Sequence, residues 1–563
     1  MIPGEYIRVE LYVPAASVSF RLGVGRLGRN RLGTITEAQW VDVTCNLVSV
    51  NMRLGGKESA ISSAMGAGHL SIRARNDLNP AQDLTIHPGL PVRVLDTRWS
   101  GEPTVLWSGH LDDLYTAYDK TSGDWDVRIS ASDRVRDLRA TTMRGGPGGL
   151  TDDQRLTART RIEEIADRID APTSILDGTG GSWTLTNIPH GDWVRFGSVP
   201  TGMTLQTPET NPFSRIFNDY FTNGAAEPEI TPFGFGATLQ LTGLTPNALY
   251  VFQVTVQPLG QTYGRQLTDF TTFGLRATTG ATGYGIPDSL LINNKNRTRR
   301  LSIGFRAGSS TVRLQLARTF EGTVSAGRDT GGLQQCRYSL SSTTLYRWNE
   351  PAGGGYPLQP VAYESSAYNQ LVMACDSAGY WWCIDELGRI RARTRTFGGL
   401  EVRFSDDHTH DINRHECYIG IDRGYDTDDT VNALEFENHG RRASDEIYDA
   451  WRVADETYEH ANNASINRYR RREVRLDTQL HEGHVLPRAQ QLWASHAEPG
   501  EVFRSLTVDG QDRPGAVHRV KILNRVEVTH EGTTRICVVT GVRHEITPKK
   551  HTVHYELRPE HTD

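Results

Sequence analysis

Acidic, histidine and cysteine side chains gather in residues 406–417, DDHTHDINRHEC, and these are the groups that hold zinc or iron or transfer protons. The stretch lacks the HExxH spacing that places two imidazoles on one helix face. We therefore expect a solvated polar loop here and no metal. The alternative is that the cluster from Asp406 to Glu416 is the catalytic centre of a glycan hydrolase, with Asp407 and Glu416 as the positions to test.

Two further motifs have the composition of known ligand sites but lack the helix or the key residues that those sites require. Residues 23–28, GVGRLG, match GxGxxG, but RNRLG follows instead of the amphipathic helix that would hold a pyrophosphate. A flexible basic loop is the expectation there. The aspartates of residues 422–429 resemble a calcium loop in composition, yet the glycine and terminal glutamate of an EF-hand are missing. These aspartates are Asp422, Asp426, Asp428 and Asp429. We expect no cofactor and no metal.

The strongest basic cluster is residues 468–472, RYRRR, where an aromatic ring lies among arginines that could contact a phosphate backbone. We favour a strand-edge or subunit-interface face paired with Glu473 and Asp477.

Acidic residues number 67 and basic residues 61, which gives a net charge of −6. This balance provides no general attraction to polyanions, and we expect no sequence-specific binding of nucleic acid.

The 563 residues predict about three to five folded units. Hydrophobic residues make up 37% and charged residues 23%, which excludes a disordered chain. The six cysteines are scattered without a CxxC pair, so we expect folding in a reducing cytosol. No window holds the ~18 apolar residues of a membrane span, and the first residues do not resemble a secretion signal. Ordinary secretion is therefore not expected.

Most apolar residues alternate with polar ones, which predicts a mainly β protein with small α/β parts. Within the first 140 residues the spacing predicts a small antiparallel barrel or sandwich. From about residue 175 to residue 348 it predicts a separate β-sandwich. The residues expected to share buried faces are Leu70, Ile72, Ala74, Val127, Ile129 and Ala131 in the first part and Leu239, Leu241, Tyr250, Phe252, Val254, Ile303, Phe305, Val312 and Leu314 in the second.

Two helices are expected beside glycine linkers. After residues 145–149, GGPGG, the stripe Ile162, Ile165, Ala166 and Ile169 has helical spacing, and Pro172 ends it. Thr151 and Gln154 have the capping-box spacing, so we expect this helix to start at Thr151.

After the second linker, residues 351–357, we expect a helix that carries Leu371, Ala374, Cys375 and Ala378, with Gly379 as its left-handed C-cap. A short hairpin should follow over residues 380–394, turning at residues 386–388. A third helical stripe is expected over Ala489 to His496, and a strand-rich end follows.

Several short strings resemble a known family. Residues 40–44 (WVDVT), 68–76 (GHLSIRARN), 88–94 (PGLPVRV) and 106–113 (LWSGHLDD) resemble the N-terminal domain of the tail-hub proteins of tailed bacteriophages, also called baseplate-hub or tail-associated minor tail proteins. Residues 430–435 (TVNALE), 465–472 and 539–547 (VTGVRHEIT) resemble later motifs of that family. The match runs in order over about 1–172 and 362–560. It departs at Arg470, where such proteins often have glycine, and over the inserted sandwich.

The insert is itself similar to jelly-roll carbohydrate-binding modules, because LTGLTPNALYVF over residues 241–252 resembles the turn that opens a core strand in such modules. Sugar recognition there needs aromatic faces and fixed polar groups. The candidate glycan contacts are Phe233, Tyr263, Arg265 and Tyr284.

The expected domains are five. They are a hub β-barrel at 1–145, a split helical α+β hub domain at 151–174 and 357–400, the jelly roll at 175–348, a central hub β domain at 401–485 and a C-terminal helix and β-domain at 486–563.

The resemblance implies a structural protein of the virion and not an enzyme. Such proteins form a homotrimer at the tail tip after assembly in the host cytoplasm. The implied partners are the distal tail protein ring, the C-terminus of the tape-measure protein and other tail-tip or receptor-binding proteins. The insert would contact host-surface glycan, or alternatively act as a spacer that stabilises the trimer.

Overall fold

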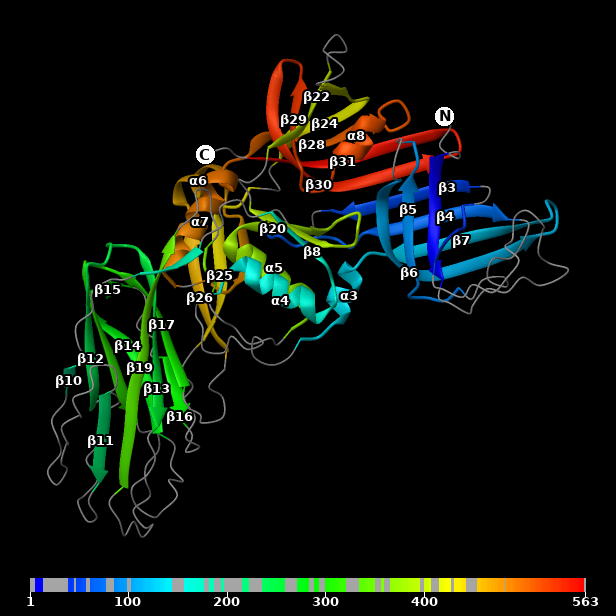
Figure 1. Cartoon of the computed structure of the whole chain (residues 1–563). Coiled ribbons are helices and arrows are strands. Elements are labelled where there is room, and N and C mark those ends of the chain that lie inside the picture. The colour runs from blue at the N-terminus through cyan, green and yellow to red at the C-terminus, as the bar shows by residue number, and fades with distance from the viewer. Residues whose placement is uncertain are drawn as a thin grey trace.

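We describe a computed structural model of the chain (Figure 1). The structure describes residues 6–13, 39–44, 47–56, 61–76, 86–98, 103–143, 156–176, 182–186, 194–196, 215–221, 235–258, 271–282, 288–292, 299–319, 334–349, 356–358, 365–394, 399–406, 415–426, 430–441, 453–480 and 482–560.

The largest sheet has 14 strands and takes them from both ends of the chain. Its main path is β2 (Gln39–Asp42), β1 (Ile7–Val13), β5 (Pro91–Asp96), β6 (Thr104–Asp119), β7 (Asp124–Ser132), β4 (His69–Asn76), β3 (Leu47–Gly55), β30 (Thr533–Thr547), β29 (Arg525–His530), β22 (Leu400–Ser405) and β23 (His415–Cys417). Three more strands branch from it: β31 (Lys550–Pro559) pairs with β30, β28 (Gly500–Asp509) with β31, and β24 (Gly420–Asp426) with β28.

The segment expected to be a separate sandwich forms two antiparallel sheets of its own. One sheet has the order β10 (Val194–Phe196), β12 (Phe235–Thr242), β18 (Thr311–Thr319), β14 (Thr271–Thr279) and β16 (Asp288–Ile292). The other has the order β11 (Arg215–Phe221), β19 (Gln334–Asn349), β13 (Leu249–Pro258), β17 (Arg299–Ala307) and β15 (Ala281–Thr282), with β9 (Ser182–Leu185) on β19. Figure 1 shows this pair of sheets projecting to one side of the molecule.

Two small sheets and six helices complete the described part of the chain. The strands are β20 (Tyr380–Ile384), β21 (Ile390–Thr394) and β8 (Thr173–Leu176) in one sheet, and β26 (Val453–Ala461), β25 (Ala433–Arg441) and β27 (Glu473–Thr478) in the other. The helices are α3 (Val135–Ala140), α4 (Ala158–Arg168), α5 (Ala367–Ala378), α6 (Asn463–Tyr469), α7 (Glu482–His496) and α8 (Pro514–Arg519). Helices α4 and α5 lie side by side (Figure 1).

The start expected for α4 is wrong. The helix begins at Ala158, and the Thr157 side chain caps it by accepting a hydrogen bond from the Thr160 N–H. Thr151 and Gln154 lie outside the described residues. Leu156 forms a β-bridge to Leu358, so the backbone just before the cap is extended and cannot continue the helix backwards.

The other local expectations for helices and hairpin are confirmed. Helix α5 ends at Ala378, and Gly379 follows with a φ of 75°, the left-handed region that glycine adopts without a steric penalty. Strands β20 and β21 form the hairpin, where the buried Asp385 carboxylate accepts hydrogen bonds from the Leu387 and Arg389 N–H groups. Helix α7 covers the third stripe.

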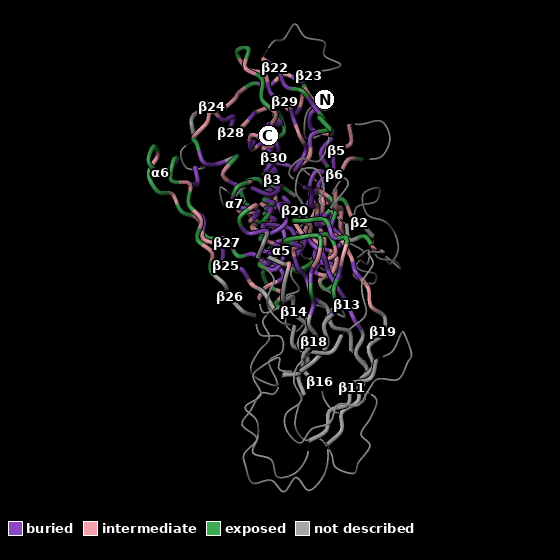
Figure 2. Tube along the Cα trace, turned by 90° about the vertical axis from the view of Figure 1, so that its left-hand side faces the viewer, coloured by how far each residue is buried: buried purple, intermediate pink, exposed green. Residues whose placement is uncertain are grey.

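Burial follows the alternation of the sequence. Buried positions gather where the two ends of the chain meet (Figure 2). In the inserted sheets Leu239, Leu241, Phe252 and Phe305 are fully buried, as expected. Val251 is fully buried as well, so β13 is covered on both faces around this residue.

The chain is therefore mainly β, with several sheets and short helices. Among the described residues, no helix is long and apolar enough to cross a membrane.

Candidate functional site

The two ends of the chain join at one strand pairing. Strand β3 pairs antiparallel with β30, so that Val50 lies opposite Ile546 and Leu54 lies opposite Val542. On its other edge β3 pairs with β4. Two strings of the family resemblance, residues 68–76 and 539–547, therefore lie on strands that flank β3. We call this region, from β4 through β3 to β30, the junction.

Two glycines of the resembling strings are explained by close contacts. The Asp133 carboxylate accepts hydrogen bonds from the Gly68 N–H at 2.7 Å and from the Val135 N–H at 2.9 Å. A side chain at Gly68 would collide with that carboxylate, and one at Gly109 would collide with the carbonyl of Ser132. Glycine is thus needed at both positions because neighbouring groups occupy the space of a Cβ atom.

A buried polar layer lies beside the junction and consists of Tyr6, Asp96, Arg98, His518, His544 and His551. Arg98 donates to the Asp96 carboxylate at 2.7 Å and to the Gly510 carbonyl at 2.7 Å, and its guanidinium lies 3.9 Å from the centre of the Tyr6 ring. The Tyr6 hydroxyl lies 3.3 Å from Nδ1 of His551, whose Nε2 lies 3.0 Å from Nδ1 of His544. The layer therefore ties the first strand of the chain to the last two.

Burial shifts the pKa values in this layer. It lowers the pKa of His551 to about 4 and the pKa of His544 well below its ordinary value. Burial alone would raise the pKa of Asp96, but hydrogen bonds from His518 and Arg98 hold that pKa below its ordinary value. The imidazoles of His544 and His551 are consequently neutral near neutral pH, and the Asp96 carboxylate is ionised. The arrangement supplies structural hydrogen bonds, because four of its residues are buried and the side chains of Arg98 and His518 are only 8% exposed.

Chain segments before and after the insert meet in the body of the protein. Leu358 forms β-bridges to both Leu156 and Leu480, and all three side chains are buried. Strand β8 spans the expected start of the insert at residue 175 and pairs parallel with β21, well after the insert, so the body extends to Leu176. The segments on the two sides of the insert, expected to form one split helical domain, therefore contact each other in the body.

Arg306 of the insert contacts His484 of α7. One terminal nitrogen of Arg306 lies 3.2 Å from both ring nitrogens of His484. The other donates a 2.5 Å hydrogen bond to the Asn247 carbonyl. The Tyr356 ring lies 5.2 Å from the His484 ring. The contact thus brings together the insert, the returning chain and α7.

The string that resembles carbohydrate-binding modules has a structural role. The hydroxyl of Tyr250 is buried and accepts a 2.9 Å hydrogen bond from the Thr245 N–H, which fixes the turn before β13. Tyr250 also stacks on Phe305. The four candidate glycan contacts, Phe233, Tyr263, Arg265 and Tyr284, lie outside the described residues.

Within the acidic stretch, residues 407–414 lie outside the described residues, and Asp407 is among them. Glu416 is buried and accepts a 2.5 Å hydrogen bond from Arg519 of α8. Asp406 accepts a 2.7 Å hydrogen bond from the Glu531 N–H and lies 3.3 Å from His530. Both described carboxylates therefore hold structural elements together.

The basic cluster is partly paired as expected. Arg471 binds the Glu473 carboxylate at 3.1 Å, and Arg468 lies 3.3 Å from Glu498, whereas Asp477 lies elsewhere on β27. Arg470 has φ 66° and ψ 163°, a conformation that is essentially restricted to glycine. This explains why a glycine is expected at that position of the motif.

One group of potential ligands was not predicted from the sequence. Glu437, His439 and Asp477 offer ligand atoms that all lie within 4.8 Å of one another. The Glu-x-His spacing places the first two on one face of a strand, but the sequence does not show which strand lies beside it.

Neither a protein-family model nor a curated protein sequence matches the chain. Among solved structures it is similar to the 43 kDa tail protein of prophage MuSo2 from Shewanella oneidensis, with 8% identity, a TM-score of 0.40 and coverage of 98% of each chain. It is also similar to the tail protein from Neisseria meningitidis MC58, with 8% identity, a TM-score of 0.40 and coverage of 91% of this chain and 96% of that one. A sugar-binding EclA C-terminal domain matches 27% of this chain and 89% of its own, with 19% identity and a TM-score of 0.16. Scores of this size do not establish a shared fold. The mainly β architecture of this chain is shown by its own strand pairing.

Proposed function

We propose that this chain is a structural protein of a bacteriophage tail, which forms a homotrimeric hub at the tail tip. The observation that carries the proposal is the β3–β30 pairing, because it joins the two segments in which the family motifs occur into one scaffold. A connecting protein needs complementary surfaces and closed symmetry and does not need an active site. Its proposed partners are the distal tail protein ring, the tape-measure C-terminus and other tail-tip or receptor-binding proteins.

An antibody against the chain tests this location on intact virions. Electron microscopy should show the label at the end of the tail farthest from the capsid, and light scattering of the purified chain should give the mass of a trimer. Label on the capsid, or no label on the virion, would contradict the proposal. Loss of cell-wall polysaccharide turnover in the Asp407→Asn, Glu416→Gln double variant would favour the hydrolase instead.

The inserted sandwich is proposed to bind host-surface glycan. It forms two sheets without any described strand pairing to the scaffold, whereas the chain segments on both sides of it pair within the scaffold. Such an arrangement lets an added module carry its own ligand site.

The test compares the full chain with a variant in which a short Gly-Ser linker replaces residues 177–355. The full chain should bind members of a glycan array that the variant does not bind. If the variant instead loses trimer formation and neither protein binds glycan, the insert is a spacer that stabilises the trimer.

A further inference from the structure

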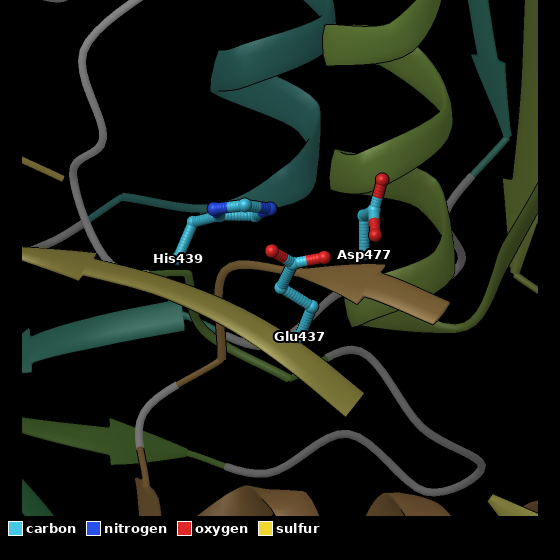
Figure 3. A group of neighbouring side chains, drawn as sticks. All are labelled: Glu437, His439 and Asp477. Atoms are coloured by element: carbon cyan, nitrogen blue, oxygen red, sulfur yellow. The ribbon is translucent and has the colours of Figure 1, made fainter. Parts of the chain in front are cut away.

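Three side chains of metal-ligating types lie together on one face of the β26-β25-β27 sheet. Glu437 and His439 are two positions apart on β25, so they project to the same face. Asp477 lies directly beside Glu437 in the parallel register of β25 and β27. Figure 3 shows the Glu437 carboxylate between the His439 ring and the Asp477 carboxylate.

The opposite face of the same sheet belongs to a hydrophobic core. Leu434 and Phe436 are buried there against Val485 and Ala489 of α7. Glu437 and His439 are partly buried, and Asp477 is exposed. An ion can therefore reach the three side chains from solvent, and substitutions among them leave the core unchanged.

The combination of donors selects the type of ion. Magnesium and calcium prefer oxygen ligands, whereas zinc accepts an imidazole nitrogen together with carboxylate oxygens. Zinc at about 2.1 Å from each ligand of a tetrahedral site places those ligands roughly 3.4 Å apart. The three groups lie within 4.8 Å of one another, so small rotations of these side chains bring the ligand atoms to that spacing.

Arg475 supports one of the ligands. It lies two positions before Asp477 on β27, where its guanidinium contacts Oε2 of Glu437 and lies 3.6 Å from Oε1 of Glu435. A carboxylate has lone pairs enough to bind a guanidinium and an ion together. Ligating carboxylates are commonly hydrogen-bonded to a second partner, which fixes the orientation of the ligand.

We propose that Glu437, His439 and Asp477 bind one Zn²⁺ ion, with a water molecule as the fourth ligand. The ion would join β25 to β27, and so strengthen the sheet that covers α7. This site is independent of the glycan and trimer proposals, because it involves neither the insert nor a second chain.

Isothermal titration of the full chain, first freed of metal with a chelator, tests the site with Zn²⁺ as the probe. The chain has 18 histidines, so the measurement is the difference between proteins. The wild type should bind one more Zn²⁺ than the Glu437→Gln, His439→Ala, Asp477→Asn triple variant. His439→Ala alone should weaken this binding at least about 10-fold, by comparison with the loss of supporting partners.

Two matched controls should keep the site. Glu459→Gln removes a carboxylate from the neighbouring strand of the same sheet, and His69→Ala removes an exposed imidazole from β4. Near-ultraviolet circular dichroism should show all variants folded. Zn²⁺ should also raise the melting temperature of the wild type more than that of the triple variant. Equal stoichiometry and affinity in the wild type and in His439→Ala would overturn the proposal, as would the absence of binding to the wild type at millimolar Zn²⁺.

Discussion

Arg53 on β3 donates a 2.8 Å hydrogen bond to the carboxylate of Glu556 on β31, 503 positions further along the chain. Both side chains keep about a third to a half of their exposure, 47% for Arg53 and 35% for Glu556. Water therefore competes for both charges, and an ion pair of this kind contributes little. The neighbouring Met52, by contrast, is buried at the junction, so apolar packing and the strand pairing hold the two ends together.

Arg53→Ala should lower the free energy of unfolding by at most about 1 kcal/mol, as for exposed ion pairs. Met52→Ala should lower it by about 2–5 kcal/mol, because it leaves a cavity at the junction. Urea unfolding followed by tryptophan fluorescence measures both changes. The reverse order of the two effects would show that the ion pair dominates the junction.

Ile165→Asp should destabilise the body by several kcal/mol, since Ile165 of α4 is fully buried and the new carboxylate would have no partner. Glu163→Gln on the same helix is the control. It removes only an exposed ion pair with Arg159 and should change stability by about 0.5 kcal/mol or less. The measurement is the yield of soluble protein together with its melting temperature. Similar values for both variants would contradict the assignment of the buried helix face.

Arg470→Gly should stabilise the protein by about 1 kcal/mol. The backbone of Arg470, at φ 66° and ψ 163°, is in a region that costs of order 1–3 kcal/mol for a residue with a side chain. Part of the gain is offset because glycine makes the unfolded chain more flexible. Arg470→Ala keeps the strained backbone and is the control. Chemical unfolding should show a gain for glycine alone, and an equal gain for alanine would indicate an effect of charge.

Stability should fall as the pH is lowered from about 6.5 towards 4. Burial depresses the pKa of His551 to about 4 and the pKa of His544 well below its ordinary value, so the unfolded chain binds more protons than the folded chain in this interval. The stabilisation is complete above the unfolded pKa and is lost below it. Asp96, whose pKa is also lowered, adds a loss below about pH 4.

The His551→Gln variant tests this dependence, because glutamine forms hydrogen bonds but does not titrate. Unfolding measured between pH 7 and pH 4 should give a smaller slope than in the wild type. The charged or titratable neighbours of His551 remain in place; they are Tyr6, Asp96, Arg98, Asp509, His518 and His544. An unchanged slope would mean that other groups cause the acid sensitivity.

Local features of the fold could be predicted from the sequence. The alternation at Leu70, Ile72 and Ala74 predicts a buried strand face, and Gly379 predicts the end of α5, because both depend on near neighbours. The predicted start of α4 was wrong. Thr157 can cap a helix as Thr151 can, and the tertiary bridge from Leu156 to Leu358 decides between these two positions.

The sequence by itself determined the strand-rich character of the chain, its helical stripes and the interrupted order of its motifs. Only the tertiary structure decided that β3 pairs with β30, that Asp477 lies beside Glu437, and that Glu416 binds Arg519. These contacts join residues tens to hundreds of positions apart. Periodicity shows which side of a strand is buried, but it contains no information about which distant strand lies at its edge.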